Sequence, residues 1–134
     1  MLIHSETEML ELGRNFAAQL KVPAVLELVG DVGAGKTTFT RGLAEGLGVK
    51  ATLSSPSFTI SRLYQGSDCI LAHYDFYRLE DPGIMSEDLA ESIADPKTVT
   101  VIEWGQSIKE LLPADHRIVE IKYVDENTRE VTIK

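Results

Sequence analysis

The chain has 134 residues, of which 43% are hydrophobic and 25% charged, a composition typical of one globular domain spanning residues 1–134. Its formal net charge of −8 argues against a broad contact with the phosphate backbone of nucleic acid. A single cysteine excludes an intramolecular disulfide, and no apolar run reaches the roughly 18 residues that a membrane-spanning helix needs. Because the N-terminal residues also lack the pattern of a signal peptide, we expect a cytoplasmic protein.

Hydrophobic periodicity and turn residues predict the secondary structure along the chain. Ser5 and Glu8 match a capping box at the start of a first helix, and apolar residues follow at helical spacing. A mostly apolar run at 25–29 predicts a buried strand that leads directly into Gly30. In chain order we predict a helix at 5–20, a strand at 25–29, a helix at 36–48, a loop at 51–57, strands at 58–64 and 69–74 that form a hairpin, a helix at 80–93, a strand at 98–102, a short helix at 108–112, and strands at 117–124 and 129–133 that form a second hairpin.

The segment Gly30–Thr37 fits the phosphate-loop pattern G-x-x-x-x-G-K-[ST]. Its glycines let backbone N–H groups approach a phosphate closely, and the N-terminus of the following helix reinforces this anion site. Lys36 can reach the β- and γ-phosphates of ATP, and the Thr37 hydroxyl can bind Mg²⁺. The predicted nucleotide-binding residues are Asp31, Val32, Gly33, Ala34, Gly35, Lys36, Thr37 and Thr38.

The predicted fold follows from this motif and from the order of the elements. A strand directly before the loop and a helix directly after it are the context that a phosphate loop requires. We therefore predict the α/β fold of P-loop NTPases, with a mixed sheet whose central strands are parallel, helices on both faces, and antiparallel hairpins.

A phosphate loop also needs a carboxylate near the metal, usually at the carboxyl end of a neighbouring strand. Glu103 follows the most strand-like segment of the chain, and Asp75 follows the strand predicted at 69–74. Both are predicted catalytic residues, and Glu103 is also the predicted metal ligand, together with Thr37. Which of the two carboxylates orients the attacking water stays open.

Four weaker candidates accompany these residues. His73 is more typical of a half-buried strand histidine than of a base, and Trp104 is more typical of packing than of nucleotide stacking. Arg78 could stabilise phosphate charge or form a surface salt bridge. The polar segment Ser54–Thr59 could sense the γ-phosphate or be an ordinary loop.

Several motifs together resemble the TsaE (YjeE) family of small bacterial ATPases. The phosphate loop is generic, whereas the pattern His-x-Asp-x-Tyr-Arg-Leu and the pair Glu-Trp are much more specific. The resemblance covers almost the whole chain and is carried by Gly30–Thr38, Ser55–Thr59, His73–Leu79, Ile102–Gly105 and Tyr123–Asp125.

The resemblance implies hydrolysis of ATP with Mg²⁺ in support of the TsaB–TsaD pair. That pair forms the threonylcarbamoyl modification on the adenosine beside the anticodon of certain tRNAs. It also implies that Glu103 takes the acidic role at the metal, with Asp75 as a second active-site carboxylate. The alternatives are a small-molecule kinase, for which we find no cluster of arginines, and a nucleotide-dependent switch module. We expect no strong direct binding of tRNA and no membrane association.

Overall fold

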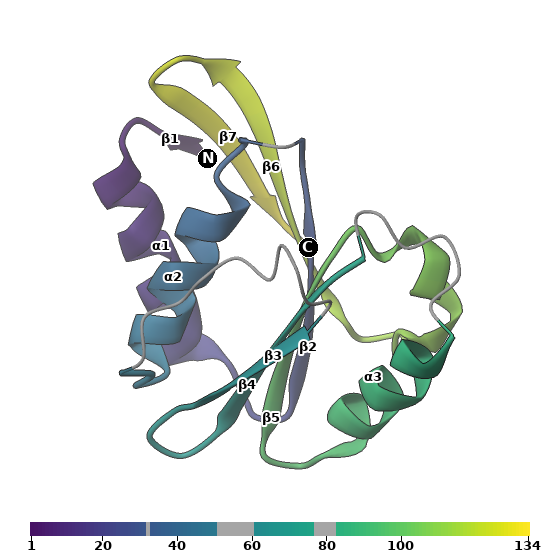
Figure 1. Ribbon diagram of the computed structural model, residues 1–134. Coiled ribbons are helices and arrows are strands. Elements are labelled where there is room, and N and C mark those ends of the chain that lie inside the picture. Colours follow the sequence, from purple (N-terminus) through teal and green to yellow (C-terminus); the bar gives the residue numbers. More distant parts are fainter. Residues whose placement is uncertain (32, 51–60, 77–82) are drawn as a thin grey trace.

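The computed structural model describes residues 1–31, 33–50, 61–76 and 83–134. It contains one sheet with helices on both faces (Figure 1). The elements in chain order are β1 (Leu2–Ile3), α1 (Glu6–Gln19), β2 (Ala24–Val29), α2 (Lys36–Gly46), β3 (Ser61–Gln65), β4 (Ile70–Asp75), α3 (Ile84–Ala94), β5 (Thr98–Glu103), the 3₁₀ helix η1 (Gly105–Leu111), β6 (Arg117–Asp125) and β7 (Thr128–Ile133).

The seven strands lie in the order β1-β7-β6-β2-β5-β4-β3. The central strand β2 is parallel to both β5 and β6, and β4 is parallel to β5. The outer pairs β3–β4, β6–β7 and β1–β7 are antiparallel. This arrangement confirms the predicted mixed sheet, and it brings the carboxyl ends of β2, β4 and β5 to the same edge.

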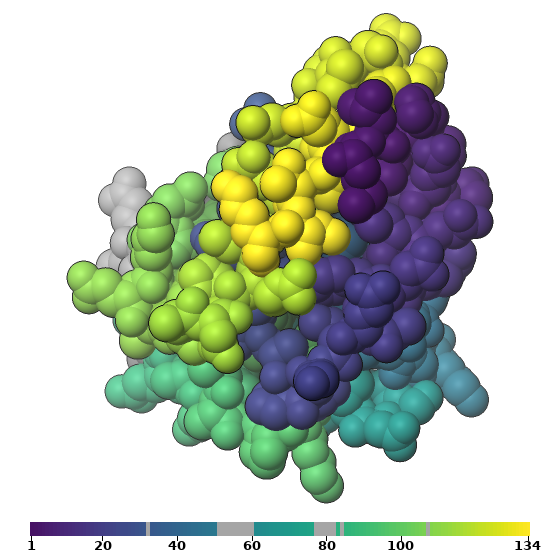
Figure 2. Space-filling view, turned by 180° about the vertical axis from the view of Figure 1, so that it is seen from behind, coloured from purple at the N-terminus to yellow at the C-terminus, as the bar shows by residue number. Residues whose placement is uncertain are grey.

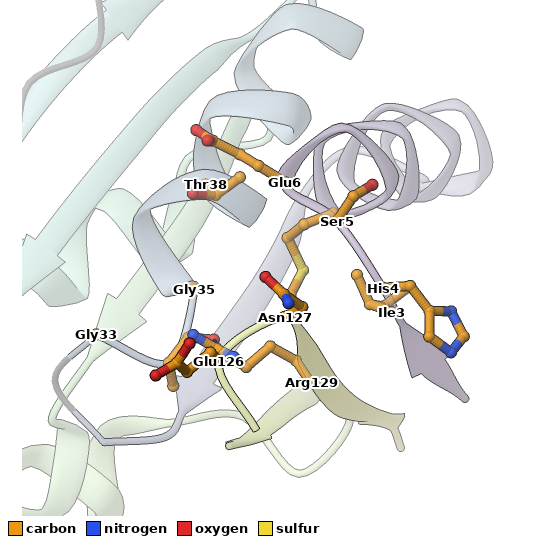
Figure 3. Close-up of a pocket in the computed structure, with 12 residues that line it drawn as sticks. Ile3, His4, Ser5, Glu6, Gly33, Gly35, Thr38, Glu126, Asn127 and Arg129 are labelled. Carbon is orange, nitrogen blue, oxygen red and sulfur yellow. Dashed lines mark hydrogen bonds between the residues drawn. The ribbon is translucent and has the colours of Figure 1, made fainter. Parts of the chain in front are cut away.

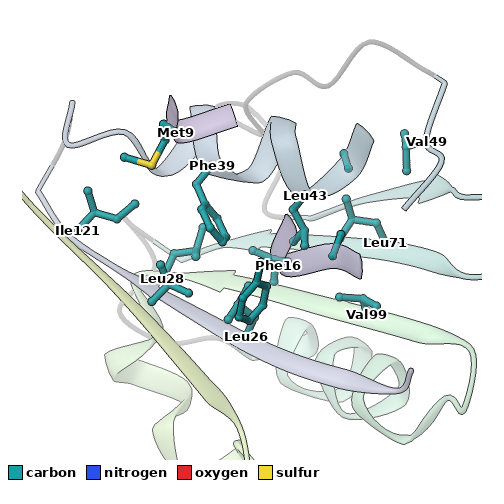
Figure 4. Packing of buried hydrophobic residues seen from close by; sticks show 14 of the residues in the cluster. Met9, Phe16, Leu26, Leu28, Phe39, Leu43, Val49, Leu71, Val99 and Ile121 are labelled. Carbon is teal, nitrogen blue, oxygen red and sulfur yellow. The ribbon is translucent and has the colours of Figure 1, made fainter. Parts of the chain in front are cut away.

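Each face of the sheet has its own hydrophobic core. Helices α1 and α2 cover one face, where Phe16 and Phe39 pack with their ring centroids 5.9 Å apart above Leu26 and Leu28 (Figure 4). Helix α3 and η1 cover the other face over a smaller cluster that includes Tyr74 and Ile102. The alternation along the strands separates the two cores, because successive side chains of a strand point to opposite faces.

Glycines allow α1 and α2 to pack very closely. A Cβ atom on Gly13 would collide with the Phe39 carbonyl oxygen, and one on Gly42 would collide with the Leu10 carbonyl oxygen. Both collisions are with backbone, so a larger residue would push the two helices apart. The close packing holds the first turn of α1 beside the start of α2, where the phosphate loop ends.

Most predicted elements are confirmed to within a few residues. Ser5 caps α1 through its hydroxyl, which accepts a hydrogen bond from the Glu8 N–H at 3.1 Å. Strand β1 was not predicted, and it lies along β7, so that the N-terminal residues lie against the C-terminal strand (Figure 2). The last helix begins at Gly105 and is a 3₁₀ helix. Residues 51–60 and 80–82, which carry part of the predicted hairpin, loop and third helix, lie outside the described residues.

None of the helices in the described part of the chain is long and apolar enough to cross a membrane.

Candidate functional site

The phosphate loop connects β2 to α2, as the motif predicts. Gly33 and Gly35 have φ values of 82° and 115°, which residues with a Cβ atom rarely adopt. Gly30 packs against the neighbouring strand, since a Cβ atom there would lie 2.6 Å from the Ile121 carbonyl oxygen. The Ala34 N–H donates to the Asp31 carbonyl oxygen at 3.0 Å, which closes a tight turn inside the loop. The glycines of the motif are therefore required by the backbone of this loop itself.

Lys36 is the first residue of α2, and its side chain is only 6% exposed. The ammonium group donates a hydrogen bond to the Gly30 carbonyl oxygen at 2.7 Å, which folds the side chain back over its own loop. Burial lowers the pKa of Lys36, although the carboxylates of Glu103, Asp75 and Asp31 act in the opposite direction. A buried cation beside a turn of backbone amides is suited to bind an anion, whose negative charge would stabilise the ammonium that burial disfavours.

The two predicted carboxylates lie on neighbouring strands. Asp75 ends β4 and Glu103 ends β5, and their Cα atoms are direct partners in the parallel register. Glu103 is 6% exposed, and its Oε1 atom lies 3.9 Å from the Lys36 ammonium. The structure thus places Asp75, Glu103 and Lys36 at one edge of the sheet, beside the phosphate loop.

His73 lies deeper in this cluster than the sequence predicts. It is 1% exposed rather than half-buried, and its Nε2 atom lies 2.6 Å from Glu103 Oε2. No local sequence pattern predicts this contact, because His73 and Glu103 are 30 positions apart.

Trp104 follows Glu103 in a left-handed backbone conformation, with φ 58° and ψ 49°. It is the only non-glycine residue with positive φ in the described part of the chain. This conformation costs a residue with a Cβ atom roughly 1–2 kcal/mol. It places the indole ring over the Lys36 ammonium, 3.9 Å from the ring centroid, which is a cation–π contact. The ring therefore contacts the cation of the site and is not only a packing residue.

Comparisons with known proteins identify the family of the chain. The protein-family model described as "Threonylcarbamoyl adenosine biosynthesis protein TsaE" matches residues 3–131. A TsaE of Bacillus subtilis is 44% identical over 117 residues, which are 87% of this chain and 72% of that protein. A TsaE of Streptomyces coelicolor is 43% identical over 109 residues, 80% of this chain and 74% of the relative. The chain belongs to the TsaE family.

The fold agrees with a solved structure as well. A crystal structure of Bacillus subtilis YdiB superposes with a TM-score of 0.83 at 34% identity, covering 99% of this chain and 82% of that one. The α/β fold predicted from the phosphate loop is therefore confirmed for this TsaE-family chain.

A groove of about 500 Å³ adjoins the phosphate loop of this TsaE-family chain (Figure 3). The loop, the start of α1 and the tip of the β6–β7 hairpin form its walls. Arg129 joins two of these walls, because its Nε–H donates to the Ala34 carbonyl oxygen at 3.1 Å. The residues that line the groove are Ile3, His4, Ser5, Glu6, Met9, Gly33, Ala34, Gly35, Thr38, Glu126, Asn127 and Arg129.

A smaller cavity of about 190 Å³ lies beside Lys36 and Trp104, with Glu27, Asp31 and Gln106 also in its lining. Lys36 lines this smaller cavity but does not line the groove of about 500 Å³.

Sequence reasoning missed Arg129 and the start of α1 as parts of the site. A single arginine in a hairpin belongs to no recognisable motif. Its position beside the phosphate loop depends on the register of β7, which no local pattern predicts. Three earlier candidates, Val32, Arg78 and the segment Ser54–Thr59, lie outside the described residues. Thr37, the other predicted metal ligand, is exposed in the first turn of α2.

Proposed function

We propose that this chain binds ATP with Mg²⁺ and hydrolyses it to ADP and phosphate, in support of the threonylcarbamoyl modification of tRNA. The observation that carries the proposal is the position of Lys36. Its ammonium lies buried beside the phosphate loop, 2.7 Å from the Gly30 carbonyl oxygen and 3.9 Å from Glu103 Oε1. The family to which the chain belongs is named for the same modification.

The two hollows beside the loop suggest how ATP lies. The groove of about 500 Å³ has the size of a small-molecule site and adjoins Gly33, Gly35 and Thr38, so the nucleoside fits there. The phosphates would then follow the loop towards Lys36 and the smaller cavity. In this arrangement the backbone amides of the loop and the ammonium neutralise the phosphate charge.

The residues of the site fit Mg²⁺. Among the described residues no three His, Cys, Asp or Glu side chains form a metal cage. Mg²⁺ usually needs no such cage, since it takes one or two protein oxygens in addition to phosphate oxygens and water. The exposed Thr37 hydroxyl and the Glu103 carboxylate are hard oxygen donors of this kind. When bound, the ion would supply positive charge to the β- and γ-phosphate oxygens.

Hydrolysis breaks the bond between the γ-phosphorus and the oxygen of ADP and forms a bond to the oxygen of water. The chain contributes position and charge, because phosphoryl transfer needs little covalent help. Asp75 and Glu103 are the groups that could hold the attacking water, and their place at adjacent strand ends suits either one.

Binding of the nucleotide is tested by calorimetry with ATP, ADP and GTP, each with Mg²⁺. We expect both adenine nucleotides to bind and Lys36→Ala to lose most of that binding. A folded chain that binds none of them would contradict the proposal. A preference for GTP would favour a GTPase switch, and a phosphorylated small molecule in a product screen would favour a kinase.

We further propose that ATP controls docking to the TsaB–TsaD pair, and that the chain does not capture tRNA directly. The net charge of −8 gives little attraction for a polyanion. Because coupling between two sites is reciprocal, the partners should tighten ATP binding by the factor by which ATP tightens docking. Partner affinity is measured with ADP and with a non-hydrolysable ATP analogue, and bare tRNA is tested in the same way. Equal partner affinity in both states, or tight tRNA binding at physiological salt, would contradict this part.

A further inference from the structure

The contact between His73 and Glu103 joins two strands beneath the candidate site. His73 lies in β4 on the same face as Asp75, and it is 1% exposed. Its Nε2 atom lies 2.6 Å from Glu103 Oε2. A carboxylate accepts hydrogen bonds, so a hydrogen on Nε2 of His73 would be donated to Glu103 in this contact.

The other ring nitrogen of His73 shows that this position is not a simple packing site. Nδ1 is buried and has no hydrogen-bond partner among the residues that the structure describes. The neighbours Leu71 and Val101 are fully buried and apolar, so an apolar side chain would fill this position without an unpartnered polar atom. The bond to Glu103 is the one polar contact of the ring in the described structure, and it accounts for a histidine here.

The bond to His73 also divides the roles of the two oxygens of Glu103. Oε2 contacts Nε2 of His73, whereas Oε1 lies 3.9 Å from the Lys36 ammonium at the phosphate loop. A carboxylate held in this way cannot turn both oxygens towards the loop. A hydrogen-bonded partner that fixes a metal ligand is a recurring feature of metal sites.

We infer that His73 is a positioning residue that holds Glu103 so that Oε1 alone faces Lys36 and the metal ion. This inference rests on the proposed function, since it assigns Glu103 to the metal of an ATP site. It requires that loss of the Nε2–H donor weakens binding of the metal-loaded nucleotide more than binding of the nucleotide alone.

Three variants separate positioning from packing. In His73→Gln the amide nitrogen lies where Nε2 was, so a donor to Glu103 is kept. In His73→Asn the amide lies where Nδ1 was and does not reach Glu103, and His73→Leu has no donor. Each purified protein is titrated with ADP in the presence of Mn²⁺ and, separately, with ADP in the presence of a chelator. Thermal unfolding of each variant reports whether it is folded.

We expect His73→Asn and His73→Leu to weaken binding of Mn²⁺·ADP by about tenfold or more. Their affinity for metal-free ADP should stay within about twofold of the parent, since the loop and Lys36 are unchanged. His73→Gln should recover most of the loss. If the Asn and Leu variants keep the metal preference of the parent, or if Gln and Asn behave alike, the inference is overturned.

A measurement on the unaltered protein tests the inference even if the variants do not fold. Nitrogen-15 NMR of the imidazole should show His73 with its hydrogen on Nε2, and addition of Mg²⁺·ADP should shift that resonance. A hydrogen on Nδ1 alone would overturn the inference. Failure of the proposed function would look different, because the parent itself would then bind no ADP, while the NMR spectrum would still report the bond to Glu103.

Discussion

Replacement of Lys36 by methionine should separate nucleotide binding from folding. Methionine keeps a long unbranched side chain and removes the ammonium, which donates to the Gly30 carbonyl oxygen at 2.7 Å. In the nucleotide complex the ammonium would instead donate to a phosphate oxygen, and a hydrogen bond that involves a charged group contributes about 1.5–3 kcal/mol. At 1.4 kcal/mol for each factor of ten, ADP affinity should fall by roughly 10- to 150-fold.

The stability of the same variant should change little. Burial lowers the pKa of Lys36 below its ordinary value of 10.5, so the unfolded chain holds this proton more strongly than the folded one. The charge therefore costs folding free energy at neutral pH. Loss of that cost offsets loss of the hydrogen bond to Gly30, and we expect a change within about 1 kcal/mol. Relative to the variant, the parent should gain stability as the pH rises towards 10.5.

Two measurements test the Lys36→Met prediction. Calorimetry gives the ADP affinity, and urea unfolding at pH 7 and at pH 10 gives the stability. Lys50→Met is the matched control, because Lys50 is exposed and lies after α2. An ADP affinity within twofold of the parent in folded Lys36→Met would refute the assignment of Lys36 to the phosphates.

Four further outcomes follow from the structure. Glu103→Gln and Asp75→Asn should each lower ATP hydrolysis in the partner complex by about 10²-fold or more, with nucleotide affinity changed much less, as phosphate-release assays would show. Gly30→Ala should lose about 1–3 kcal/mol in urea unfolding because its Cβ atom meets the Ile121 carbonyl. Gly33→Ala, with φ 82° but open space, should lose roughly 1–2 kcal/mol by strain alone. Burial raises the pKa of Tyr74 to about 12, so the parent should lose stability between pH 10 and 12, and Tyr74→Phe should lose less over that range.

The sequence was enough to predict the parts of the fold that depend on local pattern. The glycines of the phosphate loop and the strand before them are contiguous in the chain, so their context could be tested directly. The position of Glu103 beside Lys36 also followed, because parallel strands end at one edge of the sheet.

The missed features depend on pairing between distant segments. Strand β1 has only two residues, and the register of its pairing with β7 is not encoded in a local pattern. The bond from Arg129 to the Ala34 carbonyl joins residues 95 positions apart. Hydrophobic periodicity describes only the residues next to His73 in the chain, and it predicts a half-buried strand position. The burial of His73 is explained by its contact with Glu103, which lies on another strand.

The central claim is that ATP is hydrolysed at the edge formed by Lys36, Glu103 and Asp75. The most direct measurement is phosphate release from Mg²⁺·ATP by the chain alone, by TsaB and TsaD alone, and by all three together. The proposal predicts slow release by the chain alone, faster release by the complete mixture, and loss of that increase when Lys36→Met replaces the parent. Release that is absent from every mixture, or unchanged by Lys36→Met, would contradict it.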